Sequence, residues 1–135
     1  MHKNWPDVAA SLSMPLKELR GGAAEVMKGF SALARAALEP GALDTKTKEL
    51  IALAIGVATR CDACIAFHAE AAVRQGATRD EVMETMGMAI YMGAGPAVMY
   101  ASQAVEAYDQ YAAKARPAGS AADDGAAALS ARQPL

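Results

Sequence analysis

The stretch Cys61-Asp62-Ala63-Cys64-Ile65-Ala66-Phe67-His68 contains both cysteines of the protein and one of its two histidines. In a helix, Cys61, Cys64 and His68 would share one face, because positions i, i+3 and i+7 line up along the axis. Residues three apart on a helix have Cβ atoms about 5–6 Å apart, which is close to the reach of a disulfide. The stretch therefore predicts a redox-active dithiol with an imidazole beside it, and we expect the rest of the chain to form helices that bury and position it.

The composition favours a single all-α domain. The chain has 135 residues, and 53% of them are apolar while only 5% are aromatic. Alanine and methionine make up the difference, which suits closely packed helices better than a β-sandwich. A length of this order is typical of one domain with its own core. The formal net charge of −2 gives no reason to expect nucleic acid or an anionic membrane as a partner.

The N-terminus and the apolar runs predict a cytoplasmic protein. Residues 1–6, Met-His-Lys-Asn-Trp-Pro, lack the apolar segment of a signal peptide. The sequence also lacks an uninterrupted run of about 18 apolar residues, so we expect no transmembrane helix. In a cytoplasmic chain, two cysteines are more often catalytic or metal-binding than joined in a structural disulfide.

Capping and breaking residues divide the chain into about six helices. Residues 1–22 are expected to form an N-terminal arm with a short helix over 15–22, and Trp5 and Val8 are the side chains expected to pack this arm on the core. The helical core is expected over 23–113, with helices at about 23–38, 45–59, 61–75, 78–92 and 96–113. Residues 114–135, rich in alanine, glycine and serine, are expected to be disordered.

Two stretches indicate a homo-oligomer. Residues 50–58, Leu-Ile-Ala-Leu-Ala-Ile-Gly-Val-Ala, are apolar on every side of a helix, so they should be buried in a core or in a subunit interface. The methionines of residues 83–92 point in several directions around their helix, so some of them should face another subunit.

The dithiol suggests two-step redox chemistry. One thiolate would attack the O–O bond of a peroxide and become a sulfenic acid, and the second cysteine would condense with it to a disulfide. A dithiol reductant would then restore the pair by exchange. The positive end of the helix favours Cys61 as the attacking sulfur, whereas His68, one turn beyond Cys64, favours Cys64. These arguments alone leave the order of attack open.

Glu49 is the candidate that would orient His68. If the helices on either side of Arg60 form an antiparallel hairpin, Glu49 lies 11 residues and His68 lies 8 residues from the turn. At about 1.5 Å per residue, their depths are roughly 16 and 12 Å, within one helical turn of each other. We therefore predict that the carboxylate and the imidazole pair directly or through one water molecule.

Several spaced elements of the sequence resemble the carboxymuconolactone decarboxylase-like family, and within it the CxxC-containing, alkylhydroperoxidase D-like branch. The likeness covers about residues 25–110 and is carried by these elements: residues 40–44 (Pro-Gly-Ala-Leu-Asp), residues 48–54 (Lys-Glu-Leu-Ile-Ala-Leu-Ala), the Cys61, Cys64 and His68 pattern, and residues 76–78 (Gly-Ala-Thr) with Glu81.

The resemblance implies an all-α fold and a trimer or hexamer of identical chains. It also implies a proton relay in which Glu49, Cys61, Cys64 and His68 take part, with Cys64 attacking and Cys61 resolving. The substrate would be a small hydroperoxide and the reductant a dithiol of the lipoyl or thioredoxin type, with no cofactor besides the Cys61–Cys64 disulfide.

The chain also departs from that branch. Its best-studied members have a second histidine between the cysteines, where this chain has Ala63. Members of the decarboxylase branch lack the CxxC pair, so we do not expect lactone decarboxylation. Two alternatives to a peroxidase remain: a general thiol–disulfide oxidoreductase, and a non-catalytic redox module or zinc-binding module in which Glu49 and His68 complete a four-ligand set with the cysteines.

Overall fold

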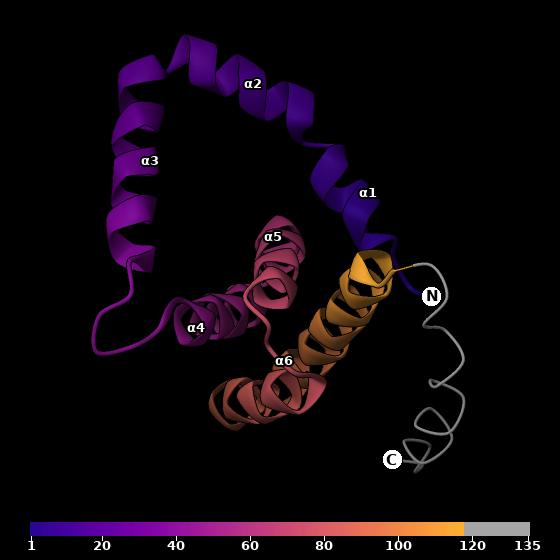
Figure 1. The fold of residues 1–135 in the computed structure, drawn as a ribbon. Coiled ribbons are helices and arrows are strands. Elements are labelled where there is room, and N and C mark those ends of the chain that lie inside the picture. Colours follow the sequence, from indigo (N-terminus) through magenta and orange to yellow (C-terminus); the bar gives the residue numbers. More distant parts are fainter. Residues whose placement is uncertain (118–135) are drawn as a thin grey trace.

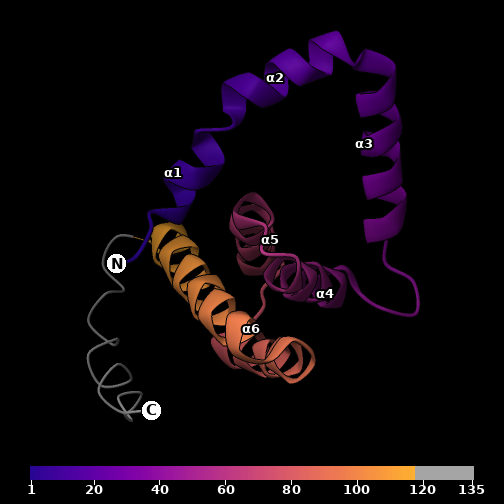
Figure 2. The same ribbon diagram turned by 180° about the vertical axis from the view of Figure 1, so that it is seen from behind.

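The protein is all-helical over the part that the computed structural model describes, residues 1–117. The helices are α1 (Trp5–Ala10), α2 (Ser13–Gly22), α3 (Ala24–Leu38), α4 (Thr45–Ala58), α5 (Asp62–Arg74) and α6 (Arg79–Ala115). The prediction of an all-α fold with about six helices is confirmed. In Figures 1 and 2, α4, α5 and α6 pack against one another, while α1, α2 and α3 form an arc that leads away from them and returns at α4.

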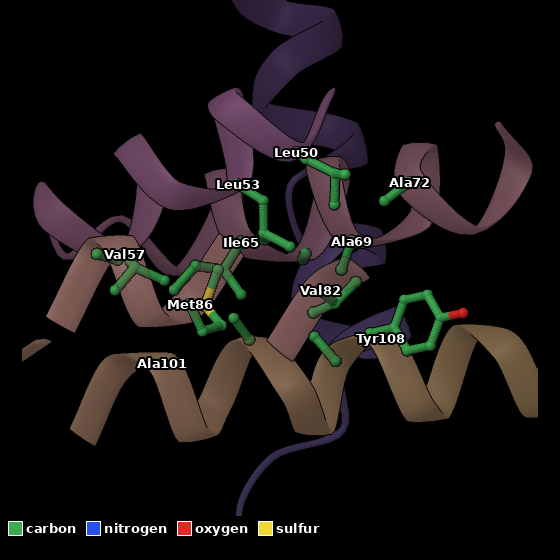
Figure 3. Close-up of a cluster of buried hydrophobic side chains, with 14 of the residues drawn as sticks. Leu50, Leu53, Val57, Ile65, Ala69, Ala72, Val82, Met86, Ala101 and Tyr108 are labelled. Atoms are coloured by element: carbon green, nitrogen blue, oxygen red, sulfur yellow. The ribbon is translucent and has the colours of Figure 1, made fainter. Parts of the chain in front are cut away.

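The core lies where α4, α5 and α6 meet, and Figure 3 shows its side chains converging from the three helices. The largest side chains that are wholly buried in this core are Trp5, which α1 contributes, and Leu53, Val57, Ile65 and Val82. Alanines of α5 and α6 fill most of the remaining positions, and Ala66, Ala69 and Ala72 of α5 are inaccessible to solvent. Such small side chains let helix axes approach closely, which explains how a chain with few aromatic residues forms a dense core.

A tight turn reverses the chain between α4 and α5. Arg60 adopts a left-handed conformation with φ of 55°, and the N–H of Cys61 donates to the carbonyl of Gly56 at 3.0 Å. The hairpin that the sequence analysis assumed, with its turn at Arg60, is therefore present. At the other end of α4, the Asp44 carboxylate caps the helix by accepting from the N–H of Thr47 at 2.7 Å.

The two helices predicted at 78–92 and 96–113 are the two halves of α6, which are separated by a kink. The predicted capping box at its start is confirmed, since Thr78 and Glu81 each accept from the other's backbone N–H. The kink lies at Ala94, whose φ of 53° is unusual for a residue with a side chain, and Pro96 follows it. The predicted break between the two helices is therefore present, as a sharp kink at a residue whose φ of 53° and ψ of −140° are not helical.

Polar contacts attach α6 to the neighbouring elements. Lys46 at the start of α4 pairs with Glu81 at 2.8 Å, and this contact lowers the pKa of the Glu81 carboxyl and raises that of the Lys46 amine. The hydroxyl of Tyr108 donates to the carbonyl of Ala77 at 2.6 Å, and burial raises the pKa of this phenol. These contacts fix the start of α6 against α4 and fix the α5–α6 loop against the second half of α6.

The N-terminal arm contains two helices, where the sequence predicted one. Pro6 lies in the first turn of α1 and Asn4 caps it, a combination that starts a helix even though α1 is short. Trp5 is wholly buried and Val8 packs beside the core, as predicted for this arm. Helix α2 begins at Ser13, two residues before the predicted start at Pro15.

Helix α3 lies outside the buried core of the single chain. No residue of α2 or α3 is buried, and Val26, Phe30 and Leu33 are each more than half exposed. In α4, the apolar run 50–58 is buried on one side only, because Ile51 and Ile55 are exposed. Helix α6 continues to Ala115, so the first residues of the segment expected to be disordered are helical. The rest of that segment, 118–135, lies outside the described residues.

Candidate functional site

The two cysteines form a disulfide at the start of α5. Cys61 is the N-cap residue and Cys64 lies in the first helical turn, with the two Cα atoms 5.2 Å apart. The Cys61 sulfur accepts a hydrogen bond from the N–H of Cys64 at 3.2 Å. Both residues are half-buried. The predicted disulfide pairing is present, and it places Cys61 where an N-terminal N–H group and the helix dipole favour negative charge on sulfur.

Gly56 allows α4 to approach the disulfide closely, and the sequence analysis did not single it out. A Cβ atom at this position would lie 3.2 Å from the Cβ of Cys64, which is tighter than an ordinary contact. The carbonyl of Gly56 also accepts from the N–H of Cys61. An isolated glycine in an otherwise apolar helical run was the signal available in the sequence.

Glu49 and His68 lie together across the α4–α5 hairpin. The Nδ1 atom of His68 is 2.7 Å from Oε2 of Glu49, which agrees with the predicted pairing. The Glu49 side chain is 6% exposed and that of His68 is 33% exposed, so the pair extends from the core toward solvent.

This pairing defines the orientation of the imidazole. A carboxylate only accepts hydrogen bonds, so Nδ1 carries the hydrogen and Nε2 of a neutral ring is left as the acceptor. The carboxylate also compensates the positive charge that the ring acquires when it takes a second proton. The arrangement can therefore move a proton through Nε2 of His68 while Glu49 holds the ring.

A second charged group, which no local pattern in the sequence indicates, lies beside the CxxC motif. Lys3, from the N-terminal arm, places Nζ 2.5 Å from Oδ2 of Asp62, the residue that follows Cys61. The two residues are 59 positions apart in the sequence, and no periodicity connects them.

The described residues do not assemble a metal site. Within 1–117, no group of three or more histidine, cysteine, aspartate and glutamate side chains is placed to hold a metal ion. The four-ligand zinc set considered from the sequence therefore does not form in this arrangement. Across the same residues, no helix combines the length and the apolar character needed to span a bilayer.

These features define the class: an all-helical protein with a CxxC disulfide at a helix start and, on the same hairpin, a buried carboxylate paired with a half-buried imidazole. The family model for the carboxymuconolactone decarboxylase family matches residues 24–107. The chain belongs to the carboxymuconolactone decarboxylase family, as the resemblance in its sequence indicated.

Solved structures and sequence relatives agree with this assignment. A carboxymuconolactone decarboxylase family protein from Legionella pneumophila is 47% identical and superposes with a TM-score of 0.78, covering 80% of this chain and 96% of its own. A family member from Thermotoga maritima, for which involvement in an antioxidative response has been suggested, is 30% identical with a TM-score of 0.67, over 76% and 87% of the two chains. Protein 4 in the cox locus of Paracoccus denitrificans is 38% identical over 75% of this chain and 96% of its own.

Proposed function

We propose that the protein reduces hydroperoxides by a thiol–disulfide cycle of Cys61 and Cys64. The observation that carries the proposal is the juxtaposition, on one helical hairpin, of a CxxC disulfide and a hydrogen-bonded Glu49–His68 pair. A disulfide that can form within one helical turn supplies the redox step, and an oriented imidazole supplies the proton transfer.

In the first half-reaction, the Cys64 thiolate attacks the outer oxygen of a hydroperoxide ROOH. The S–O bond forms as the O–O bond breaks, the departing alkoxide takes a proton and leaves as ROH, and Cys64 becomes a sulfenic acid. His68 lies one turn after Cys64 on α5, and it is the group proposed to hold and deliver the proton.

In the second half-reaction, the Cys61 thiolate attacks the sulfur of the sulfenic acid. The S–S bond forms and hydroxide leaves, which becomes water with one proton. An external dithiol, of the lipoyl or thioredoxin type, then exchanges with the disulfide and returns both cysteines to thiols. In sum, one hydroperoxide and one dithiol give one alcohol, one water and one oxidised dithiol.

The test is steady-state consumption of an organic hydroperoxide, such as cumene hydroperoxide, with reduced dihydrolipoamide or a thioredoxin system as electron donor. We expect turnover in the wild-type protein and its loss in both Cys61→Ser and Cys64→Ser. Cys61→Ser should accumulate a sulfenic acid on Cys64 that dimedone traps, because the resolving thiol is missing. Dimedone labelling of Cys61 in the Cys64→Ser variant alone would reverse the order of attack.

The assay also separates the proposal from its alternative. Fast reduction of a test disulfide without hydroperoxide consumption would replace the proposal with a general thiol–disulfide oxidoreductase. His68→Ala should slow alkylation of the reduced thiols near neutral pH, and an unchanged pH profile would contradict the role of His68 as the base.

We further propose that the protein acts as a homo-oligomer, a trimer or a hexamer. A groove of about 430 Å³ between α4 and α6 is lined mainly by apolar side chains, among them Ile51, Ile55, Met88 and Met92. Helix α3 exposes apolar side chains of its own, Val26, Phe30 and Leu33, which we call the α3 stripe. Because one copy of the chain thus has an apolar groove and an apolar helix face, we assign a second copy of this chain as the occupant of the groove.

Sedimentation at micromolar concentration tests this assembly. We expect the wild-type chain to sediment as a trimer or hexamer and Met92→Glu to dissociate it, because the substitution places a charge in an apolar interface. Met14→Glu, at an exposed methionine on α2 outside the groove, is the matched control. A monomeric wild-type protein would refute the proposal.

A further inference from the structure

The N-terminal arm reaches the redox site through one side chain. The ammonium group of Lys3 lies 2.5 Å from a carboxylate oxygen of Asp62 and 3.0 Å from the amide oxygen of Gln103 on α6. It also lies 5.3 Å from the centre of the Trp5 ring, within range of a cation–π contact. Three independent contacts thus hold this cation beside the CxxC motif.

The backbone around Lys3 is fixed as firmly as its side chain. The carboxylate of Glu106 accepts from the N–H groups of His2 and Lys3, each at 2.9 Å. The side chain of Gln110 accepts from the N–H of Trp5 and donates to the carbonyl of Lys3, both at 2.7 Å. Because α6 holds the peptide groups on both sides of Lys3, the direction in which its side chain leaves the arm is determined.

Asp62 is the acidic residue inside the CxxC motif. It is the first residue of α5, between Cys61 and Cys64 in the sequence. An isolated carboxylate there competes with a thiolate for the positive end of the helix and repels it. A lysine ammonium in contact with that carboxylate cancels the repulsion.

We propose that Lys3 is a positioning residue of the redox site, which neutralises Asp62 and so raises the thiolate fraction of the reduced CxxC pair. The role rests on the proposed dithiol cycle, but its measurement requires no peroxide. The ion pair is partly exposed, with side chains 31% and 38% accessible, so it contributes little to folding stability. Its effect is on the reactivity of the thiols.

The test is the midpoint pH of alkylation of the reduced full-length protein, with the labelled cysteine identified by mass spectrometry. We expect Lys3→Gln to raise the midpoint by about 0.5 pH units, because the Asp62 carboxylate then lies beside the thiols without its counter-charge. Below the midpoint this equals about threefold slower alkylation. Lys3→Arg keeps the charge and should restore the wild-type midpoint, and Asp62→Asn should lower it.

Two controls separate this effect from simple loss of the arm. Trp5 is the only tryptophan of the protein and is wholly buried, so its fluorescence reports whether the arm stays docked. Lys17→Gln removes the same charge from an exposed position on α2 and should leave the midpoint unchanged.

An unchanged midpoint in Lys3→Gln with Trp5 still buried would overturn the proposal, as would an equal shift in Lys17→Gln. If Lys3→Gln releases the arm, the alkylation midpoint of Asp62→Asn is the deciding measurement. An unchanged midpoint in Asp62→Asn would overturn the proposal. Because alkylation is measured without peroxide, these outcomes are independent of whether the protein turns over hydroperoxides.

Discussion

The contact between the buried Glu49 carboxylate and the half-buried His68 ring makes Glu49→Gln a sharp test of the proton relay. Glutamine has the size of glutamate, but its amide group is neutral and can present either an acceptor or a donor to Nδ1 of His68. A hydrogen bond to a charged group is worth about 1.5–3 kcal/mol, against about 1 kcal/mol for a neutral one. Since His68 is one-third exposed, solvent weakens the contact, and we take the loss as about 1.4 kcal/mol, which corresponds to a tenfold lower rate.

The assay for this variant is the rate of thiol alkylation against pH, followed by hydroperoxide turnover under the same conditions. We expect both rates to fall about tenfold near neutral pH in Glu49→Gln, while the melting temperature changes by less than about 4 °C. Glu84→Gln makes the same substitution at an exposed position of α6 and should behave like the wild type. Rates in Glu49→Gln within twofold of wild type would refute the relay, because the carboxylate would then contribute nothing to the function of the ring.

Three further substitutions test how the fold supports the site. Gly56→Ala adds a methyl group 3.2 Å from the Cβ of Cys64, so the disulfide should re-form at least several-fold more slowly, even though alanine favours the helix by about 1 kcal/mol. Stopped-flow oxidation by oxidised glutathione measures this rate, and an unchanged rate would show that α5 can move away from the added methyl group. Tyr108→Phe removes the hydrogen bond to Ala77 and should lower the free energy of unfolding by about 1 kcal/mol at pH 7. Burial raises the pKa of Tyr108 above its ordinary 10.0, so the folded state holds the phenol proton more tightly than the unfolded state. The resulting stabilisation is complete below pH 10 and declines as the pH rises toward the folded-state pKa. In denaturant unfolding between pH 7 and 11, the free energy of unfolding should therefore fall less steeply in Tyr108→Phe than in the wild type. Ala94→Gly should stabilise the protein by about 1 kcal/mol in the same unfolding assay, since glycine tolerates the φ of 53° at the kink, and a loss of stability would contradict the inferred strain.

Local sequence signals predicted the parts of the fold that depend on a few neighbouring residues. The helix starts at Asp44 and Thr78 could be read from their side chains, because capping is a contact over three residues. The disulfide between Cys61 and Cys64 followed from the spacing of one turn. Predicting the Glu49–His68 contact required one further assumption, a hairpin between the two helices. With that assumption, the helical rise on each side of the turn places the two residues at similar depths.

Packing between segments that are distant in the sequence could not be predicted from these local signals. The break between the two halves of α6 was predicted, but the angle at which the chain turns at Ala94 was not, because glycines and a proline indicate a break without setting its direction. The exposure of the α3 stripe was also missed, since periodicity shows that a face is apolar but not which surface covers it.

The sequence by itself determined that this chain is helical, that Cys61 and Cys64 lie one turn apart and, once a hairpin is assumed, that Glu49 and His68 lie at similar depths along it, because each of those relations follows from the regular geometry of a helix and one turn. Only the tertiary structure decided that Lys3 lies against Asp62 and that Gly56 touches Cys64. Contacts of this kind depend on how whole helices pack against each other. Because the hydrophobic effect that drives this packing is not directional, no local sequence pattern specifies which side chains come into contact.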